Sequence, residues 1–426
     1  MVLRIEDTDR ERSSEATIAQ ILDALRWLEL DWDGDPVSQF ARRDRHQAAI
    51  ERLLEQGKAY YDSATAEQVK AWRAVNRGAG YRGRETTADG AAIRLRVPDS
   101  GTTVVDDRIR GEVRFENRLL DDLVIARADG TALYNFAVAV DDAEMEVSDV
   151  VRGEDHLSNT PKQLLVFAAL GIEPPRYAHI PLLHGPDGKK LSKRHGAASV
   201  QELRRSGYLP EAVRNYLALL GWGADDDETL LSTDELLRRF SIDRVGRSSA
   251  IFDEKKLRWI NGRYMRESEL AAYEARLAAH LEEGDRAAAA TFAAADPAHR
   301  RAALAIVQDK AQVLSEVWKL IAFLFGEPVR DDAAWKKVMV ADGEVAVAHT
   351  LSALSALGES DFTAARIEPV LRALAEREQI KLKNLLQPIR VAVSGGLVSP
   401  GLFESLEVLG REISLSRLDA ARSSAP

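Results

Sequence analysis

The first part of the chain carries apolar residues at the spacing of helices. Residues 14–28 place an apolar side chain at about every third or fourth position, which predicts an amphipathic helix. The positions on that face are Ile18, Ile21, Leu22, Leu25 and Leu28. A short strand is expected at residues 2–5. A second amphipathic helix is expected at residues 43–56, with Gly57 as the residue that ends it.

The pattern changes after the second helix. Residues 73–92 are rich in Gly, Arg and polar residues, and the segments that follow alternate apolar and polar positions, which predicts strands. These predicted strands span residues 92–97, 111–115 and 123–127. Residues 136–151 are also strand-like. A helix is expected from Thr160 to Gly171, because Pro161 suits a first helical turn. The order predicts an α/β domain interrupted by a smaller insertion.

The second half of the chain has helical periodicity almost throughout. From about residue 200 onward, strand-like alternation is lost, and residues 270–322 are rich in Ala and Leu. Residues 364–382 form another periodic stretch, and Pro388 and Pro400 punctuate the final helices. This half is therefore predicted to be all-helical.

Composition narrows the class of protein. The 426 residues carry a net charge of −10 and are 45% hydrophobic, and a chain of this length is expected to form about three domains. The absence of cysteine excludes a disulfide framework, a thiolate nucleophile and a zinc site with Cys ligands. No apolar run approaches the roughly 18 residues of a membrane span, so we expect a cytoplasmic protein. The acidic balance argues against indiscriminate nucleic-acid binding, but local basic patches could hold RNA.

A basic loop is the strongest local signal. Residues 189–194 read Lys-Lys-Leu-Ser-Lys-Arg and follow the turn-forming sequence Gly-Pro-Asp-Gly at residues 185–188. Four cations and a hydroxyl on a flexible turn suit a polyanion whose charge grows during a reaction, such as departing pyrophosphate. The alternative interpretation is an ordinary solvated basic loop.

An acidic segment at residues 6–9, Glu-Asp-Thr-Asp, follows the first predicted strand. Open α/β sheets bind ligands at the carboxyl ends of their strands, so a carboxylate there could hold a substrate ammonium group. A polar loop without a ligand is the alternative, and a magnesium site is only weakly indicated.

Arg152 is the third candidate. Its guanidinium could receive a side-chain carboxylate through two parallel hydrogen bonds and would then reject the neutral amide isostere. The alternative is a structural ion pair between Arg152 and either Glu154 or Asp155. His156, taken alone, is more typical of a satisfied core histidine than of a catalytic base.

Together, these segments occur in the order and separation of one family. The chain resembles bacterial-type glutamyl-tRNA synthetases, which are class I aminoacyl-tRNA synthetases, over essentially its whole length. The segments that carry the resemblance are R-I-E-D-T-D-R-E-R-S at 4–13, V-V-R-G-E-D-H-L-S-N-T-P-K-Q at 150–163 and K-L-S-K-R at 190–194, with further similarity at 250–262 and 387–404.

The resemblance implies an α/β fold class. It consists of a Rossmann-like nucleotide-binding catalytic domain with an α+β insertion, followed by an all-α anticodon-binding region. The implied domains are residues 1–61 with 136–187 for the catalytic domain, 62–135 for the acceptor-binding insertion, 188–265 for a stem-contact domain with the basic loop, and 266–426 for the anticodon-binding region. A monomer is expected.

The resemblance also implies an activity. The α-carboxylate of glutamate attacks the α-phosphate of ATP, which gives glutamyl-adenylate and pyrophosphate, with Mg²⁺ as the charge partner. A hydroxyl at the 3′ end of tRNA-Glu then takes the acyl group, and activation itself usually awaits the tRNA. We therefore expect glutamate, ATP and tRNA-Glu as partners, with tRNA-Gln as a further candidate, and we expect no zinc and no membrane.

Roles for individual residues follow from the same resemblance. Glu6 is expected to bind the ammonium group of glutamate, and the pocket for its side chain is expected to contain Tyr134, Arg152 and His156. The expected catalytic residues, which neutralise phosphate charge in the transition state, are Lys190 and Lys193. The expected ATP-binding residues are Leu182, Leu183, Ser192, Lys193 and Arg194. Candidates for RNA contacts, each of which could instead be a solvated cation, are Lys381, Lys383, Arg390 and Arg411.

One family signature is absent. The H-I-G-H motif of class I synthetases normally precedes R-I-E-D-T-D, and no H-x-G-H occurs in the sequence. A polypeptide that begins at Met1 is therefore expected to have little adenylation activity, and a truncated, catalytically impaired tRNA-binding remnant is the alternative function. A second alternative is the paralogue that glutamylates a queuosine base of tRNA. Its chain ends soon after the K-L-S-K-R region, and the helical stretch from about 265 to 426 argues against it.

Overall fold

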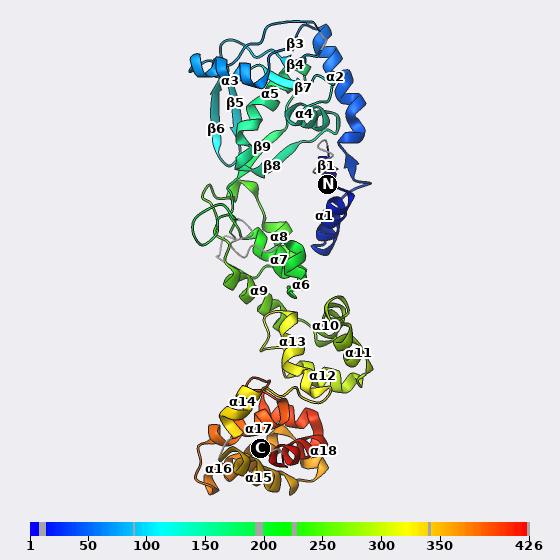
Figure 1. The fold of residues 1–426 in the computed structure, drawn as a ribbon, viewed down its shortest axis with the longest axis vertical. Helices are drawn as coiled ribbons and strands as arrows, with labels where there is room; N and C mark the ends of the chain where they lie inside the picture. Colours follow the sequence, from blue (N-terminus) through cyan, green and yellow to red (C-terminus); the bar gives the residue numbers. More distant parts are fainter. Residues whose placement is uncertain (8–13, 88–89, 192–198, 224–227, 340–341, 424–426) are drawn as a thin grey trace. The chain divides into compact units, whose positions relative to one another are not determined.

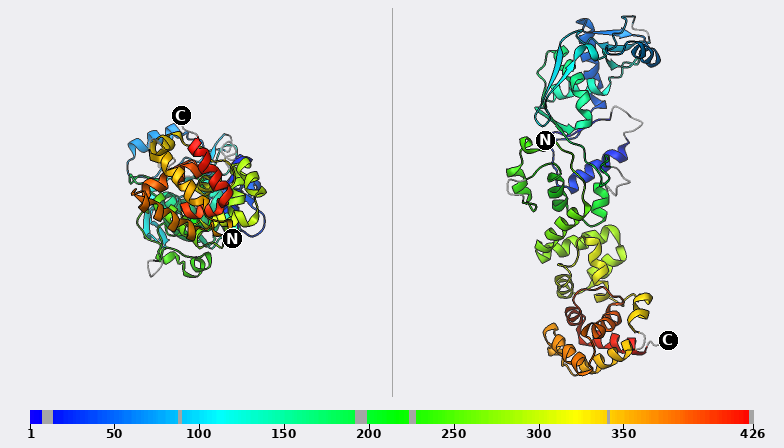
Figure 2. Two further views of the ribbon diagram at one scale, coloured as in Figure 1. Left: turned by 90° about the horizontal axis from the view of Figure 1, so that it is seen from below. Right: turned by 90° about the vertical axis from the view of Figure 1, so that its left-hand side faces the viewer.

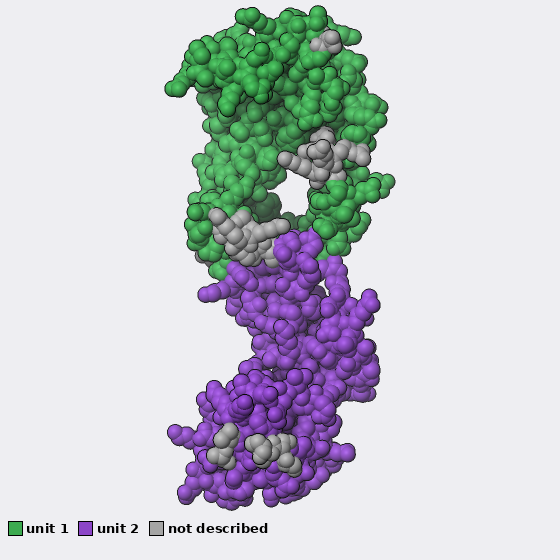
Figure 3. Space-filling view, in the orientation of Figure 1, with its two compact units in different colours: residues 1–197, 214–253 green, residues 198–213, 254–426 purple. Residues whose placement is uncertain are grey.

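The computed structural model describes residues 1–7, 14–87, 90–191, 199–223, 228–339 and 342–423. The chain forms two units, which Figure 3 distinguishes by colour. Unit 1 contains residues 1–197 and 214–253, and unit 2 contains residues 198–213 and 254–426. The chain therefore passes from one unit to the other three times, and the second passage lies inside helix α7 (Pro210–Ala218).

Unit 1 begins with a short two-stranded parallel sheet. Strand β1 (Arg4–Ile5) pairs with β2 (Val37–Ser38), and helix α1 (Glu15–Trp27) connects them. Helix α2 (Arg43–Glu55) follows, and Gly57 just beyond it has a positive φ of 66°. Glycine adopts that left-handed conformation without steric cost, which suits it to end a helix. Both predicted helices and the predicted helix end are confirmed.

Two larger sheets make up the rest of unit 1. One is antiparallel with the order β3-β4-β7, and the other has the order β6-β5-β9-β8, in which β5, β9 and β8 are parallel (Figure 1). The strands are β3 (Ala59–Asp62), β4 (Ala92–Leu95), β5 (Thr102–Asp107), β6 (Gly111–Glu116), β7 (Leu123–Ala126), β8 (Asp149–Gly153) and β9 (Arg176–Ile180). The strands predicted from alternation correspond to β4, β6 and β7. The expected domain boundaries stay a prediction.

One element differs from the sequence prediction. Most of residues 136–151 is not strand, because helix α4 (Tyr134–Glu144) occupies the first part and only β8 follows it. Every residue from Phe136 to Asp142 is buried, so the helix has no polar face in its middle to mark its period. A short, uniformly apolar run does not distinguish a buried helix from a strand.

The core of unit 1 joins helices and the antiparallel sheet. Fully buried side chains from α2, β3, β4, β7, α4 and α5 (Thr160–Leu170) form one cluster. Its members include Ile50, Leu53, Leu95, Ile125, Phe136 and Phe167. Helices α4 and α5 pack on each other, and α5 also packs on β5, so this core fixes the helices against the carboxyl ends of the parallel strands. Helix α5 ends where predicted, at Gly171 with φ +72°.

The remaining helices described in unit 1 are α3 (Ala66–Val75), the second part of α7 and α8 (Thr233–Arg239). A separate, smaller apolar cluster forms around Trp222 and Leu231.

Unit 2 is built from helices, as predicted, and Figure 2 shows them in chain order from green to red. They are α6 (Val200–Arg205), α9 (Glu254–Glu267), α10 (Leu270–Gly284), α11 (Arg286–Ala294), α12 (Pro297–Ala305), α13 (Leu314–Ile321), α14 (Asp332–Met339), α15 (Asp342–Ser355), α16 (Ala364–Arg377), α17 (Leu382–Ser394) and α18 (Leu402–Ser423). Helix α15 packs on α16, α17 and α18, and α18 is kinked at Gly410. None of the helices in the described ranges is long and apolar enough to cross a membrane.

Candidate active site

Three parallel strands place the polar side chains at the centre of the site. In the four-stranded sheet, Arg152 of β8 is the direct partner of His179 of β9. Asp107, the last residue of β5, pairs with Tyr177, which lies two residues before His179. These side chains therefore gather near the carboxyl ends of parallel strands, which is where open α/β sheets bind ligands.

Neutral acceptors hold Arg152 in place. Its Nε donates to Nε2 of His179 at 3.1 Å, and its Nη2 donates to Oγ1 of Thr160 and to Oε1 of Gln163, both at 2.9 Å. Thr160 and Gln163 lie one helical turn apart on α5, so one face of that helix supplies both acceptors.

The ion pair considered as an alternative for Arg152 is absent. Glu154 instead pairs with Arg110, and Asp155 pairs with Lys190. Within the described parts of the chain, Arg152 forms no ion pair, and its Nη1 makes no hydrogen bond. A guanidinium that is fixed by neutral groups and keeps one free amino group is suited to receive a carboxylate.

Tyr134 and His156 lie beside Arg152. The Tyr134 hydroxyl is 3.5 Å from Nδ1 of His156, and the two rings are 6.2 Å apart between their centres. Nη2 of Arg152 also reaches the backbone oxygen of His156 at 3.5 Å. Burial, together with the negative charge of Glu6, raises the pKa of Tyr134, so its hydroxyl stays protonated as a hydrogen-bond donor. The structure thus brings together the three residues predicted to surround the glutamate side chain.

Glu6 lies at the carboxyl end of β1, and its side chain is 41% exposed. Arg4 links it to α4, because Nη1 of Arg4 donates to Asp142 at 2.7 Å while Nη2 lies 3.6 Å from Oε1 of Glu6. Burial raises the pKa of Asp142, although the charge of Arg4 opposes this. The short contact to Asp142 and the long one to Glu6 leave the Glu6 carboxylate able to bind a further cation.

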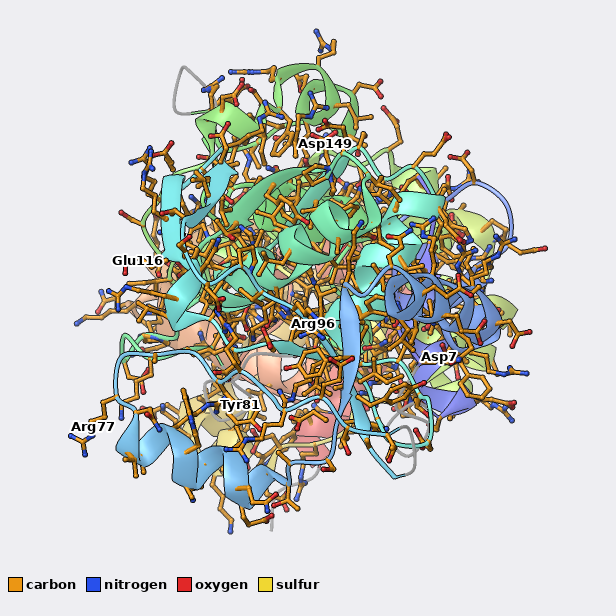
Figure 4. All side chains as sticks on the ribbon, turned by 90° about the horizontal axis from the view of Figure 1, so that it is seen from above. Asp7, Arg77, Tyr81, Arg96, Glu116 and Asp149 are labelled. Carbon is orange, nitrogen blue, oxygen red and sulfur yellow. The ribbon has the colours of Figure 1, made fainter. Side chains whose placement is uncertain are left out.

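The segment after Glu6 is anchored to the neighbouring strand. Asp7 accepts hydrogen bonds from the Ser38 hydroxyl at 2.7 Å and from the Phe40 amide at 2.8 Å. In Figure 4, Asp7 lies on the opposite side of unit 1 from Glu116, the last residue of β6. Asp7 therefore lies on the α1–α2 side of the unit and not beside the β5–β6 hairpin.

Behind this site, Asp141 links α4 to α2 and to the chain just before α2. Its fully buried carboxylate accepts hydrogen bonds from Nε2 of Gln39 at 2.9 Å, Nε of Arg42 at 2.6 Å and Nε2 of His46 at 2.9 Å. Burial alone would raise the pKa of Asp141, but these donors, His46 first, lower it, so the carboxylate stays ionised. The adjacent residue Asp142 faces Arg4, so two consecutive carboxylates fix α4 from both sides.

A cavity of about 410 Å³ adjoins Tyr134. Its lining combines residues of the antiparallel sheet region with α4 and α5, and includes Arg73, Arg94, Asp121, Asn135 and Lys162. The cations and amides in this lining could contact a polar ligand next to the position predicted for the glutamate side chain.

The basic loop is only partly described. Lys190 lies on a hairpin in which the amide of Leu191 donates to the oxygen of Leu183, and its Nζ is 2.9 Å from Asp155. The amide of Leu182 donates to Glu154 at 3.2 Å, so both predicted leucines and Lys190 lie next to the start of η3 (Glu154–Asn159). The predicted ATP-binding residues Ser192, Lys193 and Arg194 lie outside the described residues.

Sequence reasoning missed four residues of the site, namely Asp107, Thr160, Gln163 and His179. Thr160 and Gln163 stand inside the V-V-R-G-E-D-H-L-S-N-T-P-K-Q segment, and their spacing of three predicts one helix face, so that signal was available. Asp107 and His179 reach Arg152 only through the register of strands far apart in sequence, which no local pattern contains.

Two cations suggested for RNA contacts have structural roles. Arg390 donates to the backbone oxygens of Ser399 and Pro400, and Arg411 donates to those of Ser355 and Leu357. Burial lowers the pKa of Arg390. These guanidiniums satisfy carbonyl groups at the ends of helices and loops, so neither is only a solvated surface cation, and their contact with RNA stays a prediction.

Metal-ligating residues do not cluster in the described ranges. No group of three or more His, Asp or Glu side chains there is arranged to hold a metal ion.

Comparison with known families defines the class of this fold and site. Residues 1–259 match the catalytic domain of tRNA synthetases class I (E and Q), and residues 275–422 match an anticodon binding domain. An α/β catalytic domain with ligand-binding residues at the carboxyl ends of parallel strands, followed by a helical anticodon-binding domain, is a class I aminoacyl-tRNA synthetase. Such enzymes use ATP and typically Mg²⁺, and both domains imply tRNA and an amino acid as partners.

Relatives specify the family. The chain is 45% identical to the glutamate–tRNA ligase of Azorhizobium caulinodans, covering 98% of this chain and 91% of the relative. It is 42% identical to glutamate–tRNA ligase 2 of Rhodospirillum centenum, covering 99% and 92%. The crystal structure of a glutamate tRNA ligase from Elizabethkingia meningosepticum, in complex with its amino acid, superposes with a TM-score of 0.84 at 27% identity, covering 100% and 93%. The chain belongs to the glutamate–tRNA ligase family.

Proposed function

We propose that this protein activates glutamate with ATP to form glutamyl-adenylate and transfers the glutamyl group to the 3′ end of tRNA-Glu. The observation that carries the proposal is the state of Arg152. Its cation is fixed by His179, Thr160 and Gln163, has no acidic partner in the described residues, and keeps Nη1 free beside Tyr134. Such a group matches the one feature that distinguishes glutamate from glutamine, its side-chain carboxylate.

Glutamate binding would use charges of both signs. Arg152 receives the side-chain carboxylate, while Glu6 receives the ammonium group from the β1 side. The raised pKa of Tyr134 keeps its hydroxyl protonated, so it can donate a further hydrogen bond to the substrate. His156 completes the pocket wall through its contact with Tyr134.

The basic loop at residues 189–194 would bind the ATP phosphates and stabilise the charge that develops on them. Lys190, together with Lys193, neutralises the charge that develops when pyrophosphate leaves, and Leu182 and Leu183 lie close to the adenine ring. Ser192 and Arg194 would bind the phosphates. The nearest support is the contact of Lys190 with Asp155, which places the loop base against the strand end that carries Arg152. Mg²⁺, when bound, supplies charge neutralisation on the ATP phosphates.

The tRNA would be bound by both units. The helical domain that matches an anticodon binding domain is the natural site for the anticodon, and Lys381 and Lys383 stay candidates for contacts there. The choice between tRNA-Glu alone and tRNA-Glu with tRNA-Gln rests on such contacts. A monomer is the expected active state.

The test is tRNA charging with radiolabelled glutamate, in which the wild-type protein and Arg152→Gln are compared. Removal of one partner from a charge pair in a partly buried site should raise the KM for glutamate roughly 100-fold or more, while the KM for ATP stays the same. Arg114→Gln, which changes an exposed arginine of β6, is the matched control and should behave as wild type. A wild-type protein that binds tRNA but charges none contradicts the proposal and favours the alternative, a catalytically impaired tRNA-binding remnant. An Arg152→Gln variant with unchanged glutamate KM contradicts the role proposed for Arg152.

A further inference from the structure

A fully buried aspartate–histidine pair lies directly behind Arg152. Both Asp107 and His179 are almost completely shielded from solvent, and Oδ2 of Asp107 is 2.6 Å from Nδ1 of His179. The same carboxylate accepts the backbone amides of His179 at 3.0 Å, Ile109 at 3.0 Å and Arg110 at 2.7 Å. Nothing in the proposed chemistry of glutamate activation uses this pair directly.

The hydrogen bonds determine the protonation state of His179. A guanidinium can only donate, so the 3.1 Å contact from Nε of Arg152 requires Nε2 of His179 to accept. The proton of the neutral ring must then lie on Nδ1, where it donates to Asp107. Although burial opposes it, the hydrogen bonds from Arg110, the His179 side chain and other amides lower the pKa of Asp107, so an ionised acceptor fixes this tautomer.

The pair controls the orientation of Arg152. The acceptors on Nε and Nη2 fix two of the three nitrogens, and the guanidinium carbon lies 5.7 Å from the centre of the Tyr177 ring. Only Nη1 is then directed away from the protein acceptors. Loss of the acceptor on Nε would leave a buried N–H without a partner and would allow the guanidinium plane to rotate about its Cδ–Nε bond.

We propose that His179, held in its Nδ1–H tautomer by Asp107, is a positioning residue that orients Arg152 and thereby sets the affinity for glutamate and its discrimination from glutamine. The inference rests on the proposed function, because it assumes that Arg152 receives the substrate carboxylate. His179 does not touch the substrate. It acts by keeping the plane of the guanidinium fixed, so that the free Nη1 group meets an oxygen of the substrate carboxylate, whereas the neutral amide of glutamine brings no charge and can set an N–H donor against it.

A pH dependence follows from the groups that face His179. The charged or titratable groups are Asp107 from β5, Arg152 from β8 and His156 from η3. Helix α5 contributes the neutral Thr160, and Tyr177 of the same strand stacks on the ring with an interplanar angle of 8°. Burial lowers the pKa of His179 below its usual 6.5, although Asp107 opposes the shift. A proton on Nε2 of His179 would face the N–H donor at Nε of Arg152, and the hydrogen bond between them would be lost. Because the pKa of His179 is below its usual value, glutamate binding should weaken only below about pH 6.5.

The experiment compares His179→Leu with His179→Gln in the full-length protein, by charging kinetics with tRNA from pH 5 to 8. Leucine keeps the volume but removes the acceptor, so the KM for glutamate should rise roughly 10-fold to 100-fold while the KM for ATP is unchanged. Glutamine offers an amide oxygen near the position of Nε2 and cannot be protonated. It should restore most of the affinity and flatten the acid limb of the glutamate kcat/KM profile that the wild type shows.

The outcomes distinguish a failure of the inference about His179 from a failure of the proposed function. An active wild-type protein with an unaffected His179→Leu variant overturns the inference alone, as does a His179→Gln variant as impaired as His179→Leu, because a merely structural histidine would give no rescue. If His179→Leu does not fold, the comparison of the wild-type and His179→Gln pH profiles decides, and identical profiles overturn the inference. A wild-type protein without glutamate-charging activity overturns the proposed function, and this inference with it.

Discussion

Replacement of Asp141 by alanine should destabilise unit 1 strongly. The carboxylate is the shared acceptor for Gln39 and His46, which are fully buried, and for Arg42, whose side chain is 18% exposed. Each buried donor left without an acceptor costs about 1–3 kcal/mol, so the two buried donors together cost about 2–6 kcal/mol. Arg42 adds little, because it keeps its ion pair with Glu144. We therefore expect a loss of about 4 kcal/mol for Asp141→Ala.

Hydrogen–deuterium exchange is the appropriate measurement. A chain with two units does not have one free energy of unfolding, whereas amide exchange in α2 and α4 reports the local opening of this part of unit 1. A loss of about 4 kcal/mol corresponds to exchange that is roughly 1000-fold faster in peptides from both helices. Asp141→Asn keeps one acceptor oxygen and should lie between the alanine variant and the wild type.

The neighbouring residue Glu144 is the matched control. It is on the same helix and also pairs with Arg42 and Arg45, but its side chain is 35% exposed. Glu144→Ala should therefore cost less than about 1 kcal/mol. The reasoning is refuted if exchange in Asp141→Ala stays within tenfold of the wild type, or if Glu144→Ala has the same effect as Asp141→Ala.

Two further predictions test the loop and the backbone. Lys190→Ala should slow glutamyl-adenylate formation roughly 100-fold in pyrophosphate exchange measured with tRNA present, with the glutamate KM unchanged. The fold should not change, because the ion pair of Lys190 with Asp155 is exposed. An unchanged rate would remove Lys190 from the chemistry. Gly207→Ala should destabilise unit 2 by more than about 2 kcal/mol, measured by amide exchange in peptides of α6 and α13, because φ is +84° and an added Cβ would lie 2.6 Å from the Ser315 amide. Gly410→Ala, in the same unit with φ +78° but open space around it, is the control and should lose less.

The sequence was most informative where local rules apply. The helices α1, α2 and α5 were predicted from the 3.6-residue period, and the ends of α2 and α5 from glycines that adopt positive φ. Alternation was sufficient for β6, whose two faces differ in burial, and for β7, which lies at an edge of its sheet. In the central strand β4 the polar position of the pattern is Arg94, which is buried in an ion pair with Asp62. The helical second half followed from the same period.

Features that depend on contacts between distant parts of the sequence were not predicted. α4 was mistaken for a strand, because it is buried all round and carries no polar stripe until Asp141 and Asp142. Among the site residues, those on the three motif segments were predicted from the sequence, but His179 was not. Its contact with Arg152 depends on the pairing of β8 with β9, two strands that α5 separates in the sequence.

The three passages of the chain between its units have a consequence for synthesis on the ribosome. All residues of the main core of unit 1, from Ile50 to Phe167, are made before the first passage, so this core can close early. Residues 198–213 emerge next, yet their partners, such as Asn261, which accepts the Leu209 amide at 2.7 Å, follow only after residue 253. At roughly 5–20 residues per second, the apolar side chains of Tyr208 and Leu209 wait several seconds in a nascent chain without their partners. That interval is where a chaperone, or aggregation, would act on this protein.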